Sequence, residues 1–347
     1  MERWNDLGDV PAGFGPSVVT LGNFDGVHAG HRAVLGEVVT RARGAGSRAV
    51  AITFDPHPLQ VLYPDRAPSL ITSLRQRLAL MASTGLDAVL VMEFTRELAT
   101  WSPEEFVERV MVRTLGATAV VVGRDTRFGH RNSGDVETLR SLGASLGFDV
   151  EVVGDLVRPV PDSGERRWSS SWVRELLLAG DVAAAAEVLA RPHRLAGEVV
   201  HGDHRGRELG FPTANLGTPV EGLVPADGVY AGWMLRCSLP EDDPDRLLPA
   251  AVSIGTNPTF DGVSRRVEAY VLDRTDLDLY GEQVALELVS RLRSTERFDS
   301  AQALVAQMRA DVQTCRSVLG QAVVGPDGRR GDGDGGGRSA ADAPSAG

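Results

Sequence analysis

Two histidines, His28 and His31, stand three residues apart in the stretch LGNFDGVHAGH, between an apolar run and a predicted helix. Residues at this spacing share one face at the start of a helix, where free backbone N–H groups and the helix dipole favour anions. Two imidazoles there could donate hydrogen bonds to nucleotide phosphates. A pair of exposed histidines is another interpretation. A zinc site is a third, but zinc would need further ligands, and nothing nearby forms a convincing cluster.

A second set of candidate residues lies in the stretch FPTANL. Thr213 and Asn215 are two apart, so on an extended segment their side chains point the same way, and Pro212 stiffens the backbone before them. A hydroxyl and an amide that converge suit a magnesium ion with nucleotide phosphates. An ordinary turn is the other interpretation of these residues.

A third candidate is Glu268, which alternates with three apolar residues in the stretch RRVEAYVLD. Because side chains alternate along a strand, Glu268 is expected to face away from them, toward solvent or a pocket. A carboxylate in a pocket could take the proton from a hydroxyl that attacks a γ-phosphate. A solvated glutamate on a strand face is the alternative.

The elements that must position these residues change character along the chain. Up to about residue 190, apolar runs alternate with predicted helices, which indicates a parallel sheet covered on both faces. From about residue 193, strands punctuated by glycine and proline indicate an antiparallel barrel or sandwich. The loop that contains His28 and His31 follows the first apolar run, and sheets of this kind bind nucleotides at such loops. In the first half the predicted strands are 17–21, 48–54, 87–94, 117–123 and 148–154, and in the second half they are 228–237, 248–256, 265–273 and 283–293. The predicted helices are 32–43, 73–83, 103–114, 171–192 and 300–319.

The composition excludes several classes of function. The chain has 347 residues and a net charge of −11, which argues against nonspecific nucleic-acid binding. All 36 basic residues are arginines, so phosphates must be met by arginine, histidine, backbone N–H groups or metal ions rather than a P-loop lysine. We find no signal peptide and no apolar run that would span a membrane. Two cysteines, Cys237 and Cys315, do not suggest a disulfide framework, and we expect a cytoplasmic protein.

The order of the motifs resembles a known family. The HxGH of GNFDGVHAGH is similar to the signature of the nucleotidyltransferase superfamily, and TFDPHP, GRDTRFGHRNSGDVETL and SSSWVRELLLAGDV follow as in bacterial FAD synthetases. HGDHRGRELGFPTANL resembles the riboflavin kinase signature, and DGVYAGW, SIGTNPTF, VEAYVLD and DLYGEQV follow in the family order. Over about residues 16–318 the chain resembles the bifunctional bacterial riboflavin kinase/FAD synthetase family.

The resemblance implies two domains of different fold class. The first would be a Rossmann-like α/β domain with a doubly wound parallel sheet of the nucleotidyltransferase type, and the second an antiparallel β-barrel with a terminal helix. The glycine-rich tail is expected to be disordered because its composition cannot form a core. The expected boundaries are an N-terminal extension at 1–15, an FMN adenylyltransferase domain at 16–187, a riboflavin kinase domain at 188–320 and the tail at 321–347.

For the first domain the resemblance implies transfer of AMP from ATP to FMN, which gives FAD and pyrophosphate without a covalent enzyme intermediate. His28 and His31 would be the catalytic pair. The residues implied in ATP binding are Gly22, Phe24, Asp25, Gly26, His28, His31, Ser170, Ser171 and Arg174. The residues implied near the flavin are Asp55, Pro56, His57, Asp125 and Phe128.

For the second domain the resemblance implies phosphorylation of riboflavin to FMN by ATP and Mg²⁺. Glu268 would be the base, and Thr213 and Asn215 would be the magnesium and phosphate ligands. The residues implied in binding ATP, magnesium and flavin are Gly206, Gly210, Phe211, Pro212, Thr213, Asn215, Arg293 and Phe298.

Two positions depart from the family pattern. Thr126 stands where an aromatic residue is usual, and Trp172 where arginine is frequent. Two alternatives therefore stay open: a monofunctional riboflavin kinase with a degenerate first domain, and a flavin-binding or flavin-sensing protein without turnover. The expected partners are ATP, riboflavin and FMN, with no nucleic acid and no membrane. The sequence does not set the oligomeric state, and a homo-oligomer is compatible with it.

Overall fold

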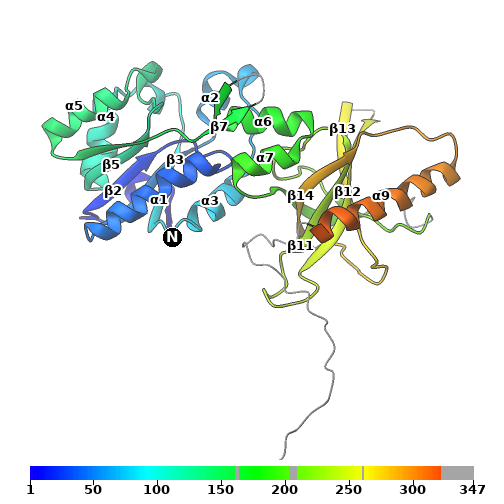
Figure 1. Ribbon diagram of the computed structural model, residues 1–347. Helices are drawn as coiled ribbons and strands as arrows, with labels where there is room; N and C mark the ends of the chain where they lie inside the picture. The colour runs from blue at the N-terminus through cyan, green and yellow to red at the C-terminus, as the bar shows by residue number, and fades with distance from the viewer. Residues whose placement is uncertain (161–163, 203–208, 260–261, 322–347) are drawn as a thin grey trace, which may run out of the picture.

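The computed structural model describes residues 1–160, 164–202, 209–259 and 262–321. They form an α/β domain and a β-barrel, which Figure 1 shows side by side with helices α6 and α7 between them. The expected disordered tail lies almost wholly outside the described residues, and Gly206 lies outside them too. No helix of the described part of the chain is long and apolar enough to cross a membrane.

The first domain contains a six-stranded parallel sheet with the order β1-β4-β3-β2-β5-β6. Because the order reverses between β2 and β5, the loop after β2 opens at the point where such sheets bind ligands. All five predicted strands are present. The strands are β1 (Glu2–Trp4), β2 (Ser17–Leu21), β3 (Arg48–Asp55), β4 (Ala88–Glu93), β5 (Ala117–Gly123) and β6 (Asp149–Val153).

Helices cover both faces of this sheet, as a doubly wound fold requires. Val18 and Val89 pack on one face with residues of α1 and α3, and Val19 and Ile52 pack on the other with residues of α4, η4 and α5. The α-helices are α1 (Ala29–Gly44), α2 (Pro58–Leu62), α3 (Leu74–Ala82), α4 (Pro103–Phe106) and α5 (Val136–Leu146), and α4 continues as the π-helix η4 (Val107–Thr114). Short 3-10 turns are η1 (Leu7–Asp9), η2 (Pro64–Arg66), η3 (Leu98–Thr100) and η5 (His130–Asn132).

The N-terminal segment and the end of the first domain add elements that the apolar pattern did not predict. β1 joins the sheet edge beside β4, and Trp4 packs edge-on against Phe14 at 4.8 Å. β7 (Val157–Val160) and β8 (Gly164–Arg167) form an antiparallel hairpin. The stretch predicted as one helix is two, because Gly180 takes a left-handed conformation at the end of α6 and Asp181 caps α7. These helices are α6 (Ser170–Ala179) and α7 (Val182–Leu189).

The second domain is a closed antiparallel barrel of six strands in the ring order β10-β13-β12-β11-β14-β9, so the barrel alternative is confirmed. α9 (Ala301–Gln321) lies along its outer wall, in orange in Figure 1, where Val312 and Cys315 pack with Ala231 and Leu272. The strands are β9 (His193–Val200), β10 (Ala214–Leu216), β11 (Gly228–Arg236), β12 (Leu247–Thr259), β13 (Gly262–Val271) and β14 (Gln283–Arg293).

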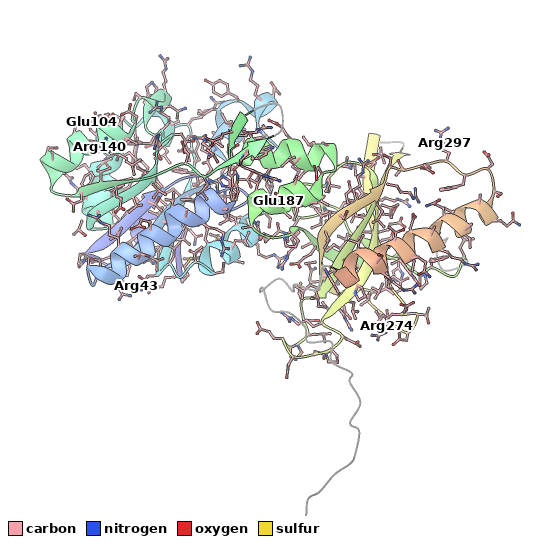
Figure 2. All side chains as sticks on the ribbon, viewed as in Figure 1. Arg43, Glu104, Arg140, Glu187, Arg274 and Arg297 are labelled. Carbon is pink, nitrogen blue, oxygen red and sulfur yellow. The ribbon has the colours of Figure 1, made fainter. Side chains whose placement is uncertain are left out.

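One hydrophobic cluster joins the linking helices to the barrel and includes Ile71 of the first domain. Trp172, Leu177 and Val188 of the linking helices are fully or almost fully buried, and they belong to the same apolar cluster as Leu195 and Tyr230 of the barrel. Figure 2 shows Glu187 on α7, between the two domains. Because this cluster is continuous, the α/β domain packs against the barrel and is not tethered to it by a free linker.

Candidate active sites

The loop between β2 and α1 follows a strained backbone path. Phe24, Gly26 and Val27 have φ angles of 49°, 80° and 40°. Glycine adopts this region without cost, but a β-branched residue does so rarely. Strain of this kind costs about 1–3 kcal/mol per residue and persists only where neighbouring contacts impose it, which is typical of functional sites.

Asp25 supplies several of those contacts. It is buried and accepts hydrogen bonds from the backbone N–H groups of Ile71 at 3.0 Å and Thr72 at 3.1 Å. A guanidinium nitrogen of Arg174 lies 2.6 Å from its Oδ2, while Arg174 Nε donates to the Ser69 carbonyl at 2.8 Å. The pair therefore ties the histidine loop to residues 69–72 and to α6, and each of its two charges has the other as its counter-charge.

His28 and His31 stack face to face, with ring centroids 3.7 Å apart. His28 caps α1, and its Nδ1 accepts the His31 N–H at 3.3 Å. A neutral His28 ring must then carry its proton on Nε2, where it can donate to a ligand. Gly30 permits this stacking, because a Cβ atom there would lie 3.1 Å from the His28 ring. The spacing argument is confirmed in so far as both rings lie together at the helix start.

The electrostatics of the histidine pair suit the binding of an anion. Burial, helped by the nearby Arg167 guanidinium, lowers the pKa of His28 to about 4. Burial and the adjacent His28 ring hold the pKa of His31 well below its usual value. Nδ1 of His31 is buried without a hydrogen-bond partner in the described part of the chain. Both rings are therefore neutral at neutral pH, and a bound anion would favour their donating hydrogen bonds or gaining protons.

The predicted serines lie at the start of α6, beside this loop. Ser169 caps the helix, and Ser170 Oγ donates to the Asp25 carbonyl at 2.9 Å. Ser171 is exposed. Trp172, which departs from the pattern expected from the resemblance, is buried in the cluster between the domains, and the Arg166 guanidinium stacks 4.9 Å above its ring. This departure therefore serves packing between the domains.

The segment predicted to lie near the flavin follows β3. His57 caps α2 through Nδ1, which accepts the Leu59 N–H at 3.2 Å, and its Nε2 lies 3.3 Å from the side-chain amide of Asn23. Burial lowers its pKa. Asp55 and Pro56 precede it at the end of the strand. The structure thus places the His57 side chain beside Asn23 of the histidine loop.

Arg77 is a residue of this region that the sequence reasoning missed. Its side chain is only 2 % exposed, and it donates to the carbonyls of Asn23 at 2.9 Å and Phe54 at 3.1 Å. Asp55 Oδ1 lies 3.4 Å away. Burial lowers the pKa of the guanidinium. The sequence held a sign that Arg77 is buried, since it stands four residues before the apolar Met81 and so shares the buried face of α3.

The other two predicted flavin residues are not placed together. Asp125 has a 62 % exposed side chain, and Arg167 lies 2.8 Å from it, so Arg167 links Asp125 to the surroundings of His28. Phe128 instead packs in the core of the first domain, with its ring centroid 6.2 Å from that of Phe106. An aromatic residue in a glycine-rich loop fits a core or a ligand equally well, and sequence alone does not separate the two.

Thr213, Asn215 and Glu268 come together on the outer wall of the barrel. Asn215 pairs with Glu268 across β10 and β13, and Glu268 pairs with Ser253 across β13 and β12, so these side chains share one face. Thr213 Oγ1 lies 3.5 Å from Glu268 Oε2, and Asn215 Nδ2 donates to the Thr213 carbonyl at 3.4 Å. The predicted alternation is confirmed, because Glu268 is partly exposed whereas its neighbour Val267 is buried.

The chain just after β9 passes close to this cluster. A Cβ atom at Gly202 would lie 2.4 Å from Asn215 Nδ2, so only glycine leaves room for the amide. The cluster offers a hydroxyl, an amide and a carboxylate, which are the oxygen donors that suit Mg²⁺ with nucleotide phosphates. The described residues contain no group of three or more His, Cys, Asp or Glu side chains that could hold a metal by themselves.

Two further residues predicted for the kinase site, Phe211 and Arg293, contact α9 or pack in the same cluster as it. Phe211 is buried, with its ring 5.2 Å from that of Tyr270. Arg293 is bound to Asp311 of α9 at 2.8 Å and lies 5.7 Å from the Phe298 ring centroid. Gly210 has a φ of 85° just before this segment, and Pro212 follows it. Arg293 and Phe211 thus fasten the terminal helix to the barrel.

Comparison with known proteins agrees with this division. A family model described as FAD synthetase matches residues 12–167, and one described as riboflavin kinase matches residues 189–319. The bifunctional riboflavin kinase/FMN adenylyltransferase of Escherichia coli (strain K12) is 36% identical over 304 residues, which cover 87% of this chain and 93% of that protein. The protein of the same description from Listeria monocytogenes is 32% identical over 320 residues, covering 92% and 95%.

A solved structure has the same architecture. It is described as a macrolide-efflux protein from Streptococcus pneumoniae, it is 29% identical, and it superposes with a TM-score of 0.79 over 90% of this chain and 98% of its own. The two matched domains stand in the same order as in the curated relatives, and the identity extends through both. The chain therefore belongs to the bifunctional riboflavin kinase/FMN adenylyltransferase family.

Proposed function

We propose that this chain makes FMN from riboflavin and ATP on its barrel, and FAD from FMN and ATP in its α/β domain. The observation that carries the proposal is that both clusters are built in one chain. The stacked histidine pair lies at the start of α1, and the Thr213–Asn215–Glu268 cluster lies on the barrel wall. The family relationship supports both reactions.

In the adenylyltransferase step, the ATP triphosphate would lie at the N-terminus of α1. The free N–H groups of the first turn and the Nε2–H of His28 would donate to its oxygens, together with His31. An FMN phosphate oxygen attacks the α-phosphorus while the bond to pyrophosphate breaks. The nucleophile belongs to FMN, so no covalent enzyme intermediate is needed. Arg174 and Asp25 would keep the loop in place while charge moves toward the leaving pyrophosphate.

In the kinase step, Glu268 would accept the proton of the riboflavin hydroxyl as its oxygen attacks the γ-phosphorus and ADP departs. Thr213 Oγ1 and the Asn215 side-chain oxygen would hold Mg²⁺ together with ATP phosphates, where the ion would neutralise developing charge. The contact between Thr213 and Glu268 supports this grouping. Because both reactions consume ATP, we propose that the enzyme acts in the cytoplasm.

The test is a chromatographic assay with purified full-length protein. One reaction contains riboflavin, ATP and Mg²⁺, and the other contains FMN, ATP and Mg²⁺. The proposal predicts FAD in both reactions, with FMN appearing before FAD in the first. FMN without FAD would support the monofunctional kinase instead, and the absence of both products would support a flavin-binding protein without turnover.

A further inference from the structure

Arg191, in the link between α7 and β9, is held in a defined place by its backbone. Its N–H donates to the Ala186 carbonyl at 3.1 Å, which closes the end of α7 after Ala190 has turned to a φ of 54°. Pro192 follows, so the next φ is fixed as well. The side chain of Arg191 therefore leaves the link in a direction set by the end of α7.

The Arg191 side chain reaches the histidine loop of the first domain. One guanidinium nitrogen donates to the Gly26 carbonyl at 2.8 Å, and another donates to the Leu189 carbonyl at 3.3 Å. The Gly26 carbonyl belongs to the peptide that leads into Val27, whose φ of 40° is strained, and His28 comes next. The bond thus acts on the backbone that aims the first imidazole.

The charge of Arg191 has no carboxylate paired with it in the described residues. Burial lowers its pKa to about 10, so the guanidinium is still protonated at neutral pH. Arg194 and Arg32 act on it with charge of the same sign, and the carboxylate of Glu287 acts in the opposite sense. A partly buried cation that bonds only to carbonyl groups in the described residues, beside a helix N-terminus, leaves the site with positive charge that a polyphosphate would balance.

We propose that Arg191 is a positioning residue of the adenylyltransferase site, which holds the Gly26–Val27 peptide and adds positive charge for the ATP triphosphate. This inference rests on the proposed role of His28 and His31. Arg191 lies beyond residue 187, where the sequence predicted the first domain to end. The link to the barrel would therefore complete the AMP-transfer site, so this site would depend on a residue outside the predicted first domain.

The test compares the full-length variants Arg191→Gln and Arg191→Lys with the wild type in both reactions. Arg191→Gln should lower kcat for FAD formation roughly tenfold to a hundredfold and raise KM for ATP, because the loop and the charge are both lost. Arg191→Lys should recover part of the KM effect, since it keeps the charge without the planar fork. Conversion of riboflavin to FMN in the same samples should stay within about twofold.

Arg75→Gln is the matched control. Arg75 also bonds across the domains, to Glu221 at 3.0 Å, but it does not contact the histidine loop. Equal losses of both activities and of melting temperature in Arg191→Gln and Arg75→Gln would overturn the proposal and leave Arg191 a structural tie. Unchanged FAD formation in Arg191→Gln would overturn it as well. His31→Gln separates the two hypotheses, because FAD formation that survives this change would refute the proposed function itself.

Discussion

The two sites of this chain are built in opposite ways. The histidine loop is enclosed: Asp25 and His28 are 2 % and 6 % exposed, and the carboxylate of Asp25 is fully bonded to Ile71, Thr72 and Arg174. The Thr213–Asn215–Glu268 cluster, the proposed kinase site, is more open: it lies on an outer barrel wall, and its three residues are partly exposed. Its side-chain contact from Thr213 to Glu268 measures 3.5 Å, at the long end of a hydrogen bond.

This difference separates the consequences of substitution in the two sites. In the enclosed site the same side chains hold the fold and are proposed to face the substrate, so a change should cost both stability and activity. In the open site the polar side chains stand on one face of strands whose other face forms the barrel core, so a change should cost activity alone. The predictions below test this contrast.

The largest expected effect is that of Glu268→Gln on the kinase reaction. Removing a general base typically slows a reaction about 10²–10⁴-fold, while the amide keeps the shape of the side chain. FMN formation from riboflavin should fall by that factor, and FAD formation from supplied FMN should be unchanged. Chromatographic rates for both substrates check this.

Glu198→Gln is the control for that change, because Glu198 is an exposed glutamate on β9 of the same barrel. Neither variant should alter the free energy of unfolding by more than about 0.5 kcal/mol. A large loss of stability in Glu268→Gln would show that the open site is not independent of the fold and would break the contrast.

Next comes Asp25→Asn, which should damage stability and FAD synthesis together. It leaves the Arg174 guanidinium, whose side chain is 14 % exposed, without its counter-charge. Removing one partner of such a pair costs about 3 kcal/mol or more. Urea unfolding followed by circular dichroism should show this loss, whereas Asp149→Asn, which removes an exposed partner of Arg41, should leave stability nearly unchanged. Equal effects of the two variants would contradict the enclosed arrangement.

Acid should destabilise the enclosed site by a smaller amount. The pKa of His28 is about 4 in the folded protein, against 6.5 for an ordinary histidine. The unfolded chain binds this proton first, so the stability present above pH 6.5 is lost as the pH falls toward 4. At pH 5 the loss from His28 is about 2 kcal/mol. Urea unfolding of the wild type and of His28→Gln between pH 5 and 7 should show a shallower pH dependence in the variant. Identical slopes would mean that His28 is already charged in the folded protein.

The fold was predictable where hydrophobic pattern decided it. The four inner strands of the sheet, β4, β3, β2 and β5, are mostly apolar runs. The barrel strands alternate between buried and exposed residues, as at Val267 and Glu268. β1 and β8 were missed because ERW and GERR are short and polar. β10 was missed because it has only three residues. The break between α6 and α7 lay at Gly180, whose left-handed turn the apolar pattern concealed.

The candidate sites were predictable where neighbouring residues in the sequence make the geometry. His28 and His31 share a helix start, and Thr213 and Asn215 share an extended segment, so spacing was enough. The roles of Arg77 and Arg191 were not predicted, because their partners, Asn23 and Gly26, lie 54 and 165 residues away in the sequence. Those contacts depend on how α3 and the interdomain link pack, which no local pattern encodes.

The smallest expected effect concerns the ion pair between Arg75 of the first domain and Glu221 of the second. Arg75 on α3 pairs with Glu221, and its side chain is 62 % exposed, so Arg75→Gln should cost no more than about 1 kcal/mol of unfolding free energy. The neighbouring bonds from Ser73 Oγ to Glu221 at 2.6 Å and from the Leu223 N–H to the Ile71 carbonyl at 3.2 Å remain. Because Asp25 accepts a hydrogen bond from the Ile71 N–H, the contact between the domains and the enclosed site share the backbone at Ile71. Salt should weaken the Arg75 contribution in unfolding experiments. A loss in Arg75→Gln as large as that in Asp25→Asn would mean that the exposed ion pair, and not the shared core, holds the domains together.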